Sequence, residues 1–138
     1  MGIRLLLVDD HAVVRSGLRM LLEGEADMEI VGEAGTGEEA LRAVQGLRPD
    51  VILMDIGLPD QSGIDATRAI KQHNPATAVV ALTIHEDEEY FFRMLEAGAT
   101  GYVPKRAAPE ELLTAIRTAA GGEVYLYPSL ARLLVTDY

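Results

Sequence analysis

The chain has 138 residues, with 22 Asp and Glu against 12 Lys and Arg, which gives a net charge of −10 at pH 7. This length predicts one domain with its own core, and the negative charge disfavours binding of nucleic acid or of an anionic membrane by this chain itself. The absence of cysteine excludes disulfides, thiolate metal sites and a cysteine nucleophile. Because no apolar run approaches the roughly 20 residues of a membrane helix and no signal peptide is visible, we expect a cytoplasmic location.

Short apolar runs alternate with longer amphipathic segments along the chain. The runs are residues 3–8, 29–31, 51–54, 79–82 and 101–103. Continuous runs of Val, Ile and Leu are typical of strands that are buried on both faces of a parallel sheet. Between the runs, apolar residues recur at steps of three and four, which predicts amphipathic helices. These segments are residues 13–22, 40–47, 64–70, 91–95 and 112–119.

Residues that favour helix ends agree with this division. Ser62 or Gly63 can open the third helix, and Pro109 stands at the first position of the fifth. Gly98 follows the fourth helix, and Gly121-Gly122 ends the fifth. The sequence therefore predicts an α/β fold of five βα units, with five parallel strands joined by right-handed crossovers.

The last segment, residues 123–138, differs from the rest. Tyr125, Leu126 and Tyr127 precede Pro128, and the apolar residues that follow predict a short sixth helix over 130–135. Because five units are complete by residue 122, we expect a domain over 1–122 and a connector or docking helix over 123–138. A C-terminal helix that packs on its own domain is the alternative.

Polar side chains stand where the predicted strands end. Asp9 and Asp10 follow the first strand, Asp55 the third, Thr83 the fourth and Lys105 the fifth. Ligands of open parallel sheets bind outside the carboxyl ends of the strands, so these side chains should meet at one edge. Each of these residues alone could have a purely structural role, as a helix cap, a strand-end acid or a surface lysine. Their joint occurrence at the strand ends favours a functional site.

The charges of this set predict its chemistry. Two carboxylates about 4 Å apart repel by roughly 4 kcal/mol at an effective dielectric constant near 20. Oxygen ligands with room for water suit Mg²⁺ as the neutralising cation. A carboxylate beside a cation and a lysine is a good phosphoryl acceptor. We expect His11, in the first helical turn, to face solvent; a metal ligand or a phosphoryl carrier are the alternatives.

At these positions the chain resembles a receiver domain of bacterial response regulators. The resemblance rests on Leu7-Val8-Asp9-Asp10-His11, Met54-Asp55-Ile56-Gly57-Leu58-Pro59, Leu82-Thr83 and Gly101-Tyr102-Val103-Pro104-Lys105, and it covers residues 3 to about 122. It implies a flavodoxin-like, doubly wound fold with strand order 2-1-3-4-5. It also implies a phospho-accepting switch in two-component signalling.

The resemblance assigns the acidic residues. Asp55 would be the phosphorylated aspartate. Asp9, Asp10, Asp55 and the backbone carbonyl of Gly57 would hold Mg²⁺ or Mn²⁺. The phosphoryl donor would be the phosphohistidine of a sensor histidine kinase.

The resemblance also assigns the residues that respond. Thr83 and Lys105 would contact the phosphoryl group, and Tyr102 would turn inward when Thr83 shifts. We expect Ile84 and His85 to limit the access of water and so to set the phosphoryl lifetime.

The resemblance is narrower still to the NarL/FixJ group, whose members usually continue into a LuxR-type helix-turn-helix DNA-binding domain. That domain is absent from this sequence, so we expect a part of a longer transcription regulator, with a stand-alone receiver as the alternative. Phosphorylation would then change homodimerisation or release the output domain. Arg106 follows Lys105 where many receivers have Pro, which leaves the geometry of the Lys105–Arg106 peptide open.

Two other functions compete with this interpretation. One is a Mg²⁺-dependent phosphatase or phosphotransferase that uses an aspartyl phosphate, but the sequence has no insertion that could shelter a substrate. The other is a pseudo-receiver that is never phosphorylated, which the intact set of acids, Thr83 and Lys105 argues against. We therefore expect a switch that catalyses only its own phosphorylation and dephosphorylation.

Overall fold

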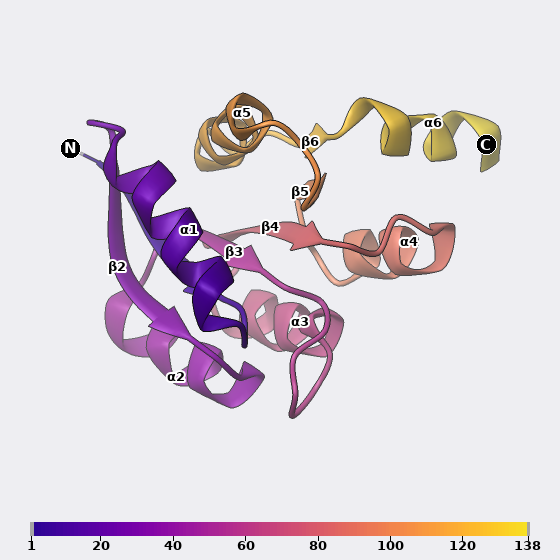
Figure 1. The fold of residues 1–138 in the computed structure, drawn as a ribbon. Coiled ribbons are helices and arrows are strands. Elements are labelled where there is room, and N and C mark those ends of the chain that lie inside the picture. The colour runs from indigo at the N-terminus through magenta and orange to yellow at the C-terminus, as the bar shows by residue number, and fades with distance from the viewer. Residues whose placement is uncertain (1, 138) are drawn as a thin grey trace.

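A six-stranded parallel sheet forms the centre of the computed structural model, which describes residues 2–137 (Figure 1). The strands are β1 (Ile3–Val8), β2 (Met28–Ala34), β3 (Val51–Met54), β4 (Ala78–Thr83), β5 (Gly101–Pro104) and β6 (Tyr125–Leu126). The helices are α1 (Ala12–Glu23), α2 (Gly37–Leu47), α3 (Gly63–His73), α4 (Glu88–Glu96), α5 (Pro109–Ala120) and α6 (Pro128–Asp137). Among these helices, none is long and apolar enough to cross a membrane.

The strand order is β2-β1-β3-β4-β5-β6, which confirms the predicted flavodoxin-like arrangement but corrects the predicted number of strands from five to six. The additional strand β6 pairs in parallel with β5, with Tyr125 opposite Gly101 and Leu126 opposite Tyr102. A strand of two residues has no detectable periodicity, so no pattern in the sequence predicts it. It covers the backbone edge that β5 would otherwise expose.

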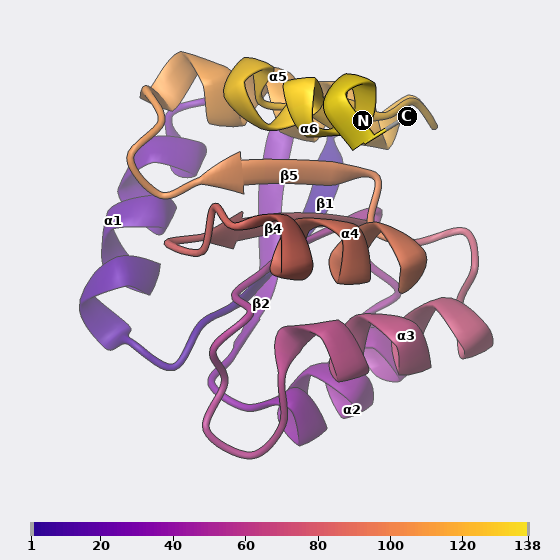
Figure 2. The ribbon, with the colours of Figure 1, turned by 90° about the vertical axis from the view of Figure 1, so that its right-hand side faces the viewer.

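The helices form a layer on each face of the sheet. One layer contains α1 and α5, whose Leu22 and Ile116 pack with apolar side chains of the strands, such as Leu53. The other contains α2, α3 and α4, whose Ile70 and Phe91 are fully buried against the opposite face (Figures 1 and 2). Nearly every side chain of β3, β4 and β5 is thus buried, as continuous apolar runs predict.

The predicted helix starts are confirmed. The Ser62 side chain accepts a hydrogen bond from the amide of Asp65 and caps α3, and Pro109 is the first residue of α5. The cap of α2, Thr36, accepts a hydrogen bond from the amide of Glu39 in the same way.

The C-terminal segment packs on the rest of the chain. The amide of Tyr125 donates to the Thr100 carbonyl at 2.8 Å, and that of Tyr127 donates to the Tyr102 carbonyl at 3.2 Å. In α6, Leu130 is 2% exposed and belongs to the core cluster on the α4 side. In the view of Figure 2, α6 lies above β5 and α4 lies below it.

Candidate functional site

The carboxyl edge of the sheet gathers the polar residues that the sequence singled out. Asp9 directly follows β1, Asp55 follows β3, Thr83 is the last residue of β4 and Lys105 follows β5. The arrowheads of β4 and β5 point to this edge in Figure 2. Because all strands are parallel, residues that are up to 96 positions apart in sequence meet here.

Lys105 bridges two buried carboxylates. Its Nζ lies 2.9 Å from Oδ2 of Asp9 and 3.6 Å from Oδ1 of Asp55. Asp9 is 2% exposed and Asp55 is 6% exposed, so both acids lie largely out of water. One ammonium therefore offsets two carboxylates, and the site retains a net negative charge.

The His11 ring lies beside Asp9, on the oxygen that Lys105 does not contact. The backbone amide of His11 donates to Asp9 Oδ1 at 2.9 Å, and Nδ1 of the His11 ring lies 3.0 Å from the same oxygen. The ring Nδ1 is also 3.1 Å from Oδ1 of Asp10. The His11 side chain is well exposed, as predicted, but its contact with both acids was not expected from the sequence.

The two buried acids have opposite pKa shifts. Burial would raise the pKa of Asp9, but hydrogen bonds from the His11 amide and from Lys105 outweigh it, so that this pKa lies below its usual value. Burial raises the pKa of Asp55, with Asp9 and Asp10 acting in the same direction and Lys105 opposing them. Asp55 is thus the acid whose charge is least well compensated in the absence of another cation.

The donor set suits a divalent cation. One ligand atom from each of Asp9, Asp10, His11 and Asp55 can be chosen so that all four lie within 4.8 Å of one another. Carboxylate oxygens are the ligands that Mg²⁺ prefers. The residual negative charge of the site and the raised pKa of Asp55 are both consistent with a missing positive charge, so the residues present fit a divalent ion.

The predicted switch residues, Thr83 at the end of β4 and Tyr102 in β5, both form hydrogen bonds with the backbone of His85. The Thr83 hydroxyl oxygen accepts a hydrogen bond from the amide of His85 at 3.0 Å. Tyr102 is fully buried, and its hydroxyl donates to the His85 carbonyl at 2.7 Å. Burial raises the pKa of Tyr102, so this phenol remains a donor at neutral pH. Ile84, which lies between Thr83 and His85 in the sequence, is 73% exposed.

Two glycines shape the loop around Asp55. The amide of Gly57 donates to Asp55 Oδ1 at 3.4 Å, which places the residue with the predicted carbonyl ligand next to Asp55. A Cβ atom on Gly63 would lie 2.1 Å from the backbone oxygen of Asp55. Sequence reasoning treated Gly63 only as a helix start and missed this close approach, which lets α3 begin directly against the Asp55 loop.

Arg15 is another residue that sequence reasoning missed. Its guanidinium donates to the backbone oxygen of Asp9 and also binds Glu33 at 2.9 Å. It therefore ties the loop after β1 to strand β2. Its position one helical turn after His11 places it near the site, but no residue type signals such a contact in advance.

The loop after β5 has ordinary backbone geometry. No peptide bond within residues 2–137 is cis, so the Lys105–Arg106 bond is trans. Arg106 forms a bidentate ion pair with Glu86, at 2.6 and 2.9 Å. The guanidinium carbon also lies 5.3 Å from the centroid of the Tyr127 ring.

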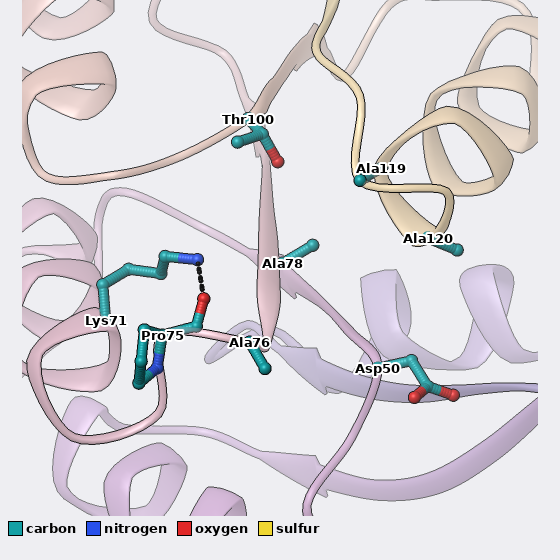
Figure 3. Close-up of a pocket in the computed structure, with 9 residues that line it drawn as sticks. Asp50, Lys71, Pro75, Ala76, Ala78, Thr100, Ala119 and Ala120 are labelled. Carbon is teal, nitrogen blue, oxygen red and sulfur yellow. Dashed lines mark hydrogen bonds between the residues drawn. The ribbon is translucent and has the colours of Figure 1, made fainter.

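A pocket of about 240 Å³ lies at the opposite edge of the sheet (Figure 3). It is bordered by Asp50 and Thr100, which precede β3 and β5, and by Lys71 of α3. Nζ of Lys71 donates to the backbone oxygens of Pro75 and Thr77, both at 2.8 Å, and so closes the turn after α3. None of the predicted site residues borders this pocket, and the acidic edge remains the candidate site.

Comparison with known proteins agrees with this geometry. The family model described as the response regulator receiver domain matches residues 5–117. The chain is 43% identical over 136 residues to the oxygen regulatory protein NreC of Staphylococcus haemolyticus (strain JCSC1435), and 44% identical over 136 residues to that of Staphylococcus aureus (strain JH9). Each match covers 98% of this chain but 63% of the relative, so the chain spans less than two thirds of these relatives' length.

Solved structures show the same fold. A two-component response regulator of the LuxR family from Aurantimonas sp. SI85-9A1 has a TM-score of 0.94 at 36% identity, covering 99% of this chain and 98% of that chain. The isolated REC domain of RcsB from Salmonella enterica serovar Typhimurium, in the presence of phosphomimetic BeF3⁻, has a TM-score of 0.88 at 26% identity, covering 96% and 99%. A structure of two RcsB dimers bound to two parallel DNAs has a TM-score of 0.88 at 26% identity, covering 97% and 68%.

Proposed function

The chain belongs to the response regulator receiver domain family, and from this premise we propose that Asp55 is the residue that accepts the phosphoryl group. One observation carries the assignment. Lys105 reaches both Asp55 and Asp9, so that Asp55 shares a single ammonium with a neighbouring carboxylate. Asp55 is also the acid with the raised pKa, which indicates a need for further positive charge.

Asp9, Asp10 and Asp55, with the backbone carbonyl of Gly57, are the groups that we propose to hold Mg²⁺ or Mn²⁺. When bound, the ion supplies positive charge to the oxygens of the transferring phosphoryl group. Lys105 contributes in the same way from the side of β5. Its distance of 3.6 Å from Asp55 allows its ammonium to follow the phosphoryl oxygens after transfer.

The proposed transfer needs no general base. A carboxylate oxygen of Asp55 attacks phosphorus and forms the new P–O bond, while the P–N bond to the histidine of a sensor kinase breaks and its electron pair stays on the imidazole. Dephosphorylation is a separate step, in which water attacks the same phosphorus, the P–O bond to Asp55 breaks and its carboxylate leaves, and the protons of the water pass to the released phosphate and to solvent. Catalysis by the chain thus consists of positioning and electrostatic stabilisation, and it serves only its own phosphorylation and dephosphorylation.

Phosphorylation would act on Thr83 and Tyr102 through the loop after β4. Three phosphoryl oxygens would attract the Thr83 hydroxyl, which now accepts from the amide of His85. Movement of that loop would also break the hydrogen bond between Tyr102 and the His85 carbonyl. We also assign Ile84 and His85, which directly follow Thr83, control of the phosphoryl lifetime by limiting the access of water to Asp55.

The output belongs to the same proposal. We assign residues 1–122 to the receiver and 123–138 to a connector that leads to a DNA-binding domain in the whole regulator. RcsB, whose receiver is similar, has been solved as dimers bound to DNA, which supports homodimerisation as one mode of output. The chain itself, with its net charge of −10, would not contact DNA. We place this chain in the cytoplasm, where a sensor histidine kinase would donate the phosphoryl group.

Intact-mass measurement after incubation with acetyl phosphate and Mg²⁺ tests the proposal. We expect one added phosphoryl group, which is absent without a divalent ion and absent in Asp55→Asn. Asp65→Asn, which removes an exposed carboxylate from α3, is the matched control and should still be phosphorylated. A chain that binds Mg²⁺ but gains no phosphoryl group would be a pseudo-receiver, and turnover of an external phosphoester would indicate the rival enzyme.

A further inference from the structure

His11 stands at the open side of the acidic cluster. Its ring nitrogen Nδ1 lies 3.0 Å from Asp9 Oδ1 and 3.1 Å from Asp10 Oδ1, and its side chain is 64% exposed. Lys105 occupies the other oxygen of Asp9, so the imidazole and the ammonium flank this acid from two sides. The proposed function uses the three acids and Lys105, but it gives no role to the imidazole.

Histidine is also not among the residues that are favoured at the backbone position of His11. It is the N-cap of α1, where Ser, Thr, Asp and Asn are favoured because their side chains accept a helix amide. The His11 side chain makes no such hydrogen bond. The ring instead faces the acids, with Nδ1 in contact with Asp9 and Asp10, so an ion that these acids bind would replace those contacts and meet the same nitrogen.

We propose that His11 is a nitrogen ligand of the divalent ion. Ions that bind imidazole well, such as Ni²⁺, Co²⁺ and Zn²⁺, would then bind this site more tightly than they would bind the carboxylates alone. The inference rests on the cation site of the proposed function. Carboxylate oxygen suits Mg²⁺ and Mn²⁺, whereas imidazole suits Zn²⁺ and Ni²⁺. A mixed set of oxygen ligands and one nitrogen therefore shifts selectivity towards the second group.

The distances allow one ion to reach all four side chains. Two ligands that are each about 2.1 Å from an ion lie at most about 4.2 Å apart. The four candidate ligand atoms lie within 4.8 Å of one another, so the most distant pair would need to approach by about 0.6 Å at most. Coordination by Nδ1 requires its lone pair, and any proton on this nitrogen leaves when the ion binds.

Electron spin echo measurements on the Mn²⁺-loaded chain give the most direct test. The unpaired electrons of Mn²⁺ couple to a coordinated imidazole nitrogen, and this coupling modulates the echo. We expect the modulation in the parent chain, its loss in His11→Gln, and its retention in His73→Gln, whose ring contacts the Ala69 carbonyl at the far end of α3.

Calorimetric titration gives the corresponding selectivity. His11→Gln should weaken the binding of Ni²⁺ by about 10- to 100-fold while changing that of Mg²⁺ by less than about threefold. His73→Gln should change neither affinity. Equal weakening of Ni²⁺ and Mg²⁺, or no nitrogen modulation in the parent chain, would overturn the role of His11 as a ligand.

The outcomes separate this inference from the function on which it rests. If Mg²⁺ binds and Asp55 is phosphorylated, but His11→Gln leaves the Ni²⁺ affinity unchanged, only the role of His11 is wrong. If no divalent ion binds the parent chain or Asp65→Asn, the cation site itself is wrong, and both proposals fail.

Discussion

Asp55 carries a charge that the metal-free fold accommodates poorly. It is buried and shares one lysine with Asp9, and its pKa is raised by burial first and by neighbouring acids second. A carboxyl whose pKa is higher in the folded chain than in the unfolded chain binds a proton more tightly when folded. Its contribution to stability is therefore fully present below the unfolded pKa and is lost as the pH rises through the folded pKa.

The first prediction follows from the direction of the pKa shift of Asp55. Asp55→Asn should increase the free energy of unfolding of the metal-free chain at pH 7, by on the order of 1 kcal/mol, because it removes a poorly compensated charge. The gain should disappear below about pH 4, where the carboxyl of the parent chain is protonated too. Urea unfolding at both pH values measures this, and equal effects at the two would contradict the electrostatic explanation.

The second prediction concerns Lys105. Lys105→Met should destabilise the metal-free chain by about 2 kcal/mol, because it leaves Asp9 and Asp55 buried without their shared cation. Mg²⁺ should recover part of this loss. The control is Arg106→Met, which breaks an exposed ion pair with Glu86 and should cost less than about 1 kcal/mol. A larger loss in the control would place the stabilising charge elsewhere.

At the level of residues, the sequence predicted the site residues that follow strands, but not the contacts that side chains at the start of α1 make with the acids. Asp55, Thr83 and Lys105 could be placed because the carboxyl edge of a parallel sheet is fixed by topology. The contacts of His11 and Arg15 depend on how two side chains leave the first turn of α1, which has no periodic signal.

At the level of elements, α3 illustrates how tightly the site is supported. Because a Cβ atom on Gly63 would lie 2.1 Å from the Asp55 oxygen, Gly63→Ala must displace either the helix or the Asp55 loop. We predict a loss of about 2 kcal/mol or more in stability and slower phosphorylation. Gly46→Ala in α2, where a Cβ would meet nothing within 4 Å, should instead stabilise by roughly 0.5–1 kcal/mol.

Phosphorylation kinetics and chemical unfolding of the two glycine variants provide the measurement. Normal phosphorylation in Gly63→Ala would show that the close packing of α3 does not determine the position of Asp55.

The C-terminal segment gives the fourth prediction. Leu130→Ala should cost about 2–3 kcal/mol, because this side chain is 2% exposed in the core beside α4. The amides of Tyr125 and Tyr127, which pair with the edge of β5, should then exchange with solvent faster. Val135→Ala, at an 80% exposed position of the same helix, should change neither quantity appreciably. Unchanged exchange in Leu130→Ala would mean that β6 is held independently of α6.

Long elements were predictable from the sequence, and the shortest was not. The apolar runs of β3 and β4 and the cap of α3 could be identified because each has a strong local signal. Strand β6 has two paired residues, Tyr125 and Leu126, and its existence depends on the free edge of β5 rather than on its own pattern. The predicted tail helix over 130–135 is confirmed within α6, which begins at Pro128.

On the scale of the whole molecule, the parallel sheet joins the chemistry to the rest of the fold. Its carboxyl edge brings acids from two loops to one lysine, Lys105, which directly follows β5. Tyr102 in the same strand pairs with Leu126 of the neighbouring β6. A phosphoryl group would add about −1.5 to −2 charges at this edge of a chain that is already negative. We therefore expect a change at Asp55 to reach the C-terminal segment through β5 and the Tyr102–His85 hydrogen bond.

The central claim is that Asp55 is the phosphoryl acceptor, and chemical trapping of the acyl phosphate tests it most directly. Borohydride reduces an aspartyl phosphate to homoserine, so peptide sequencing by mass spectrometry identifies the residue that was phosphorylated. After incubation with acetyl phosphate and Mg²⁺, we predict homoserine at position 55 and at no other aspartate. Homoserine at Asp9 or Asp10, or a phosphorylated chain with Asp55 unmodified, would contradict the account.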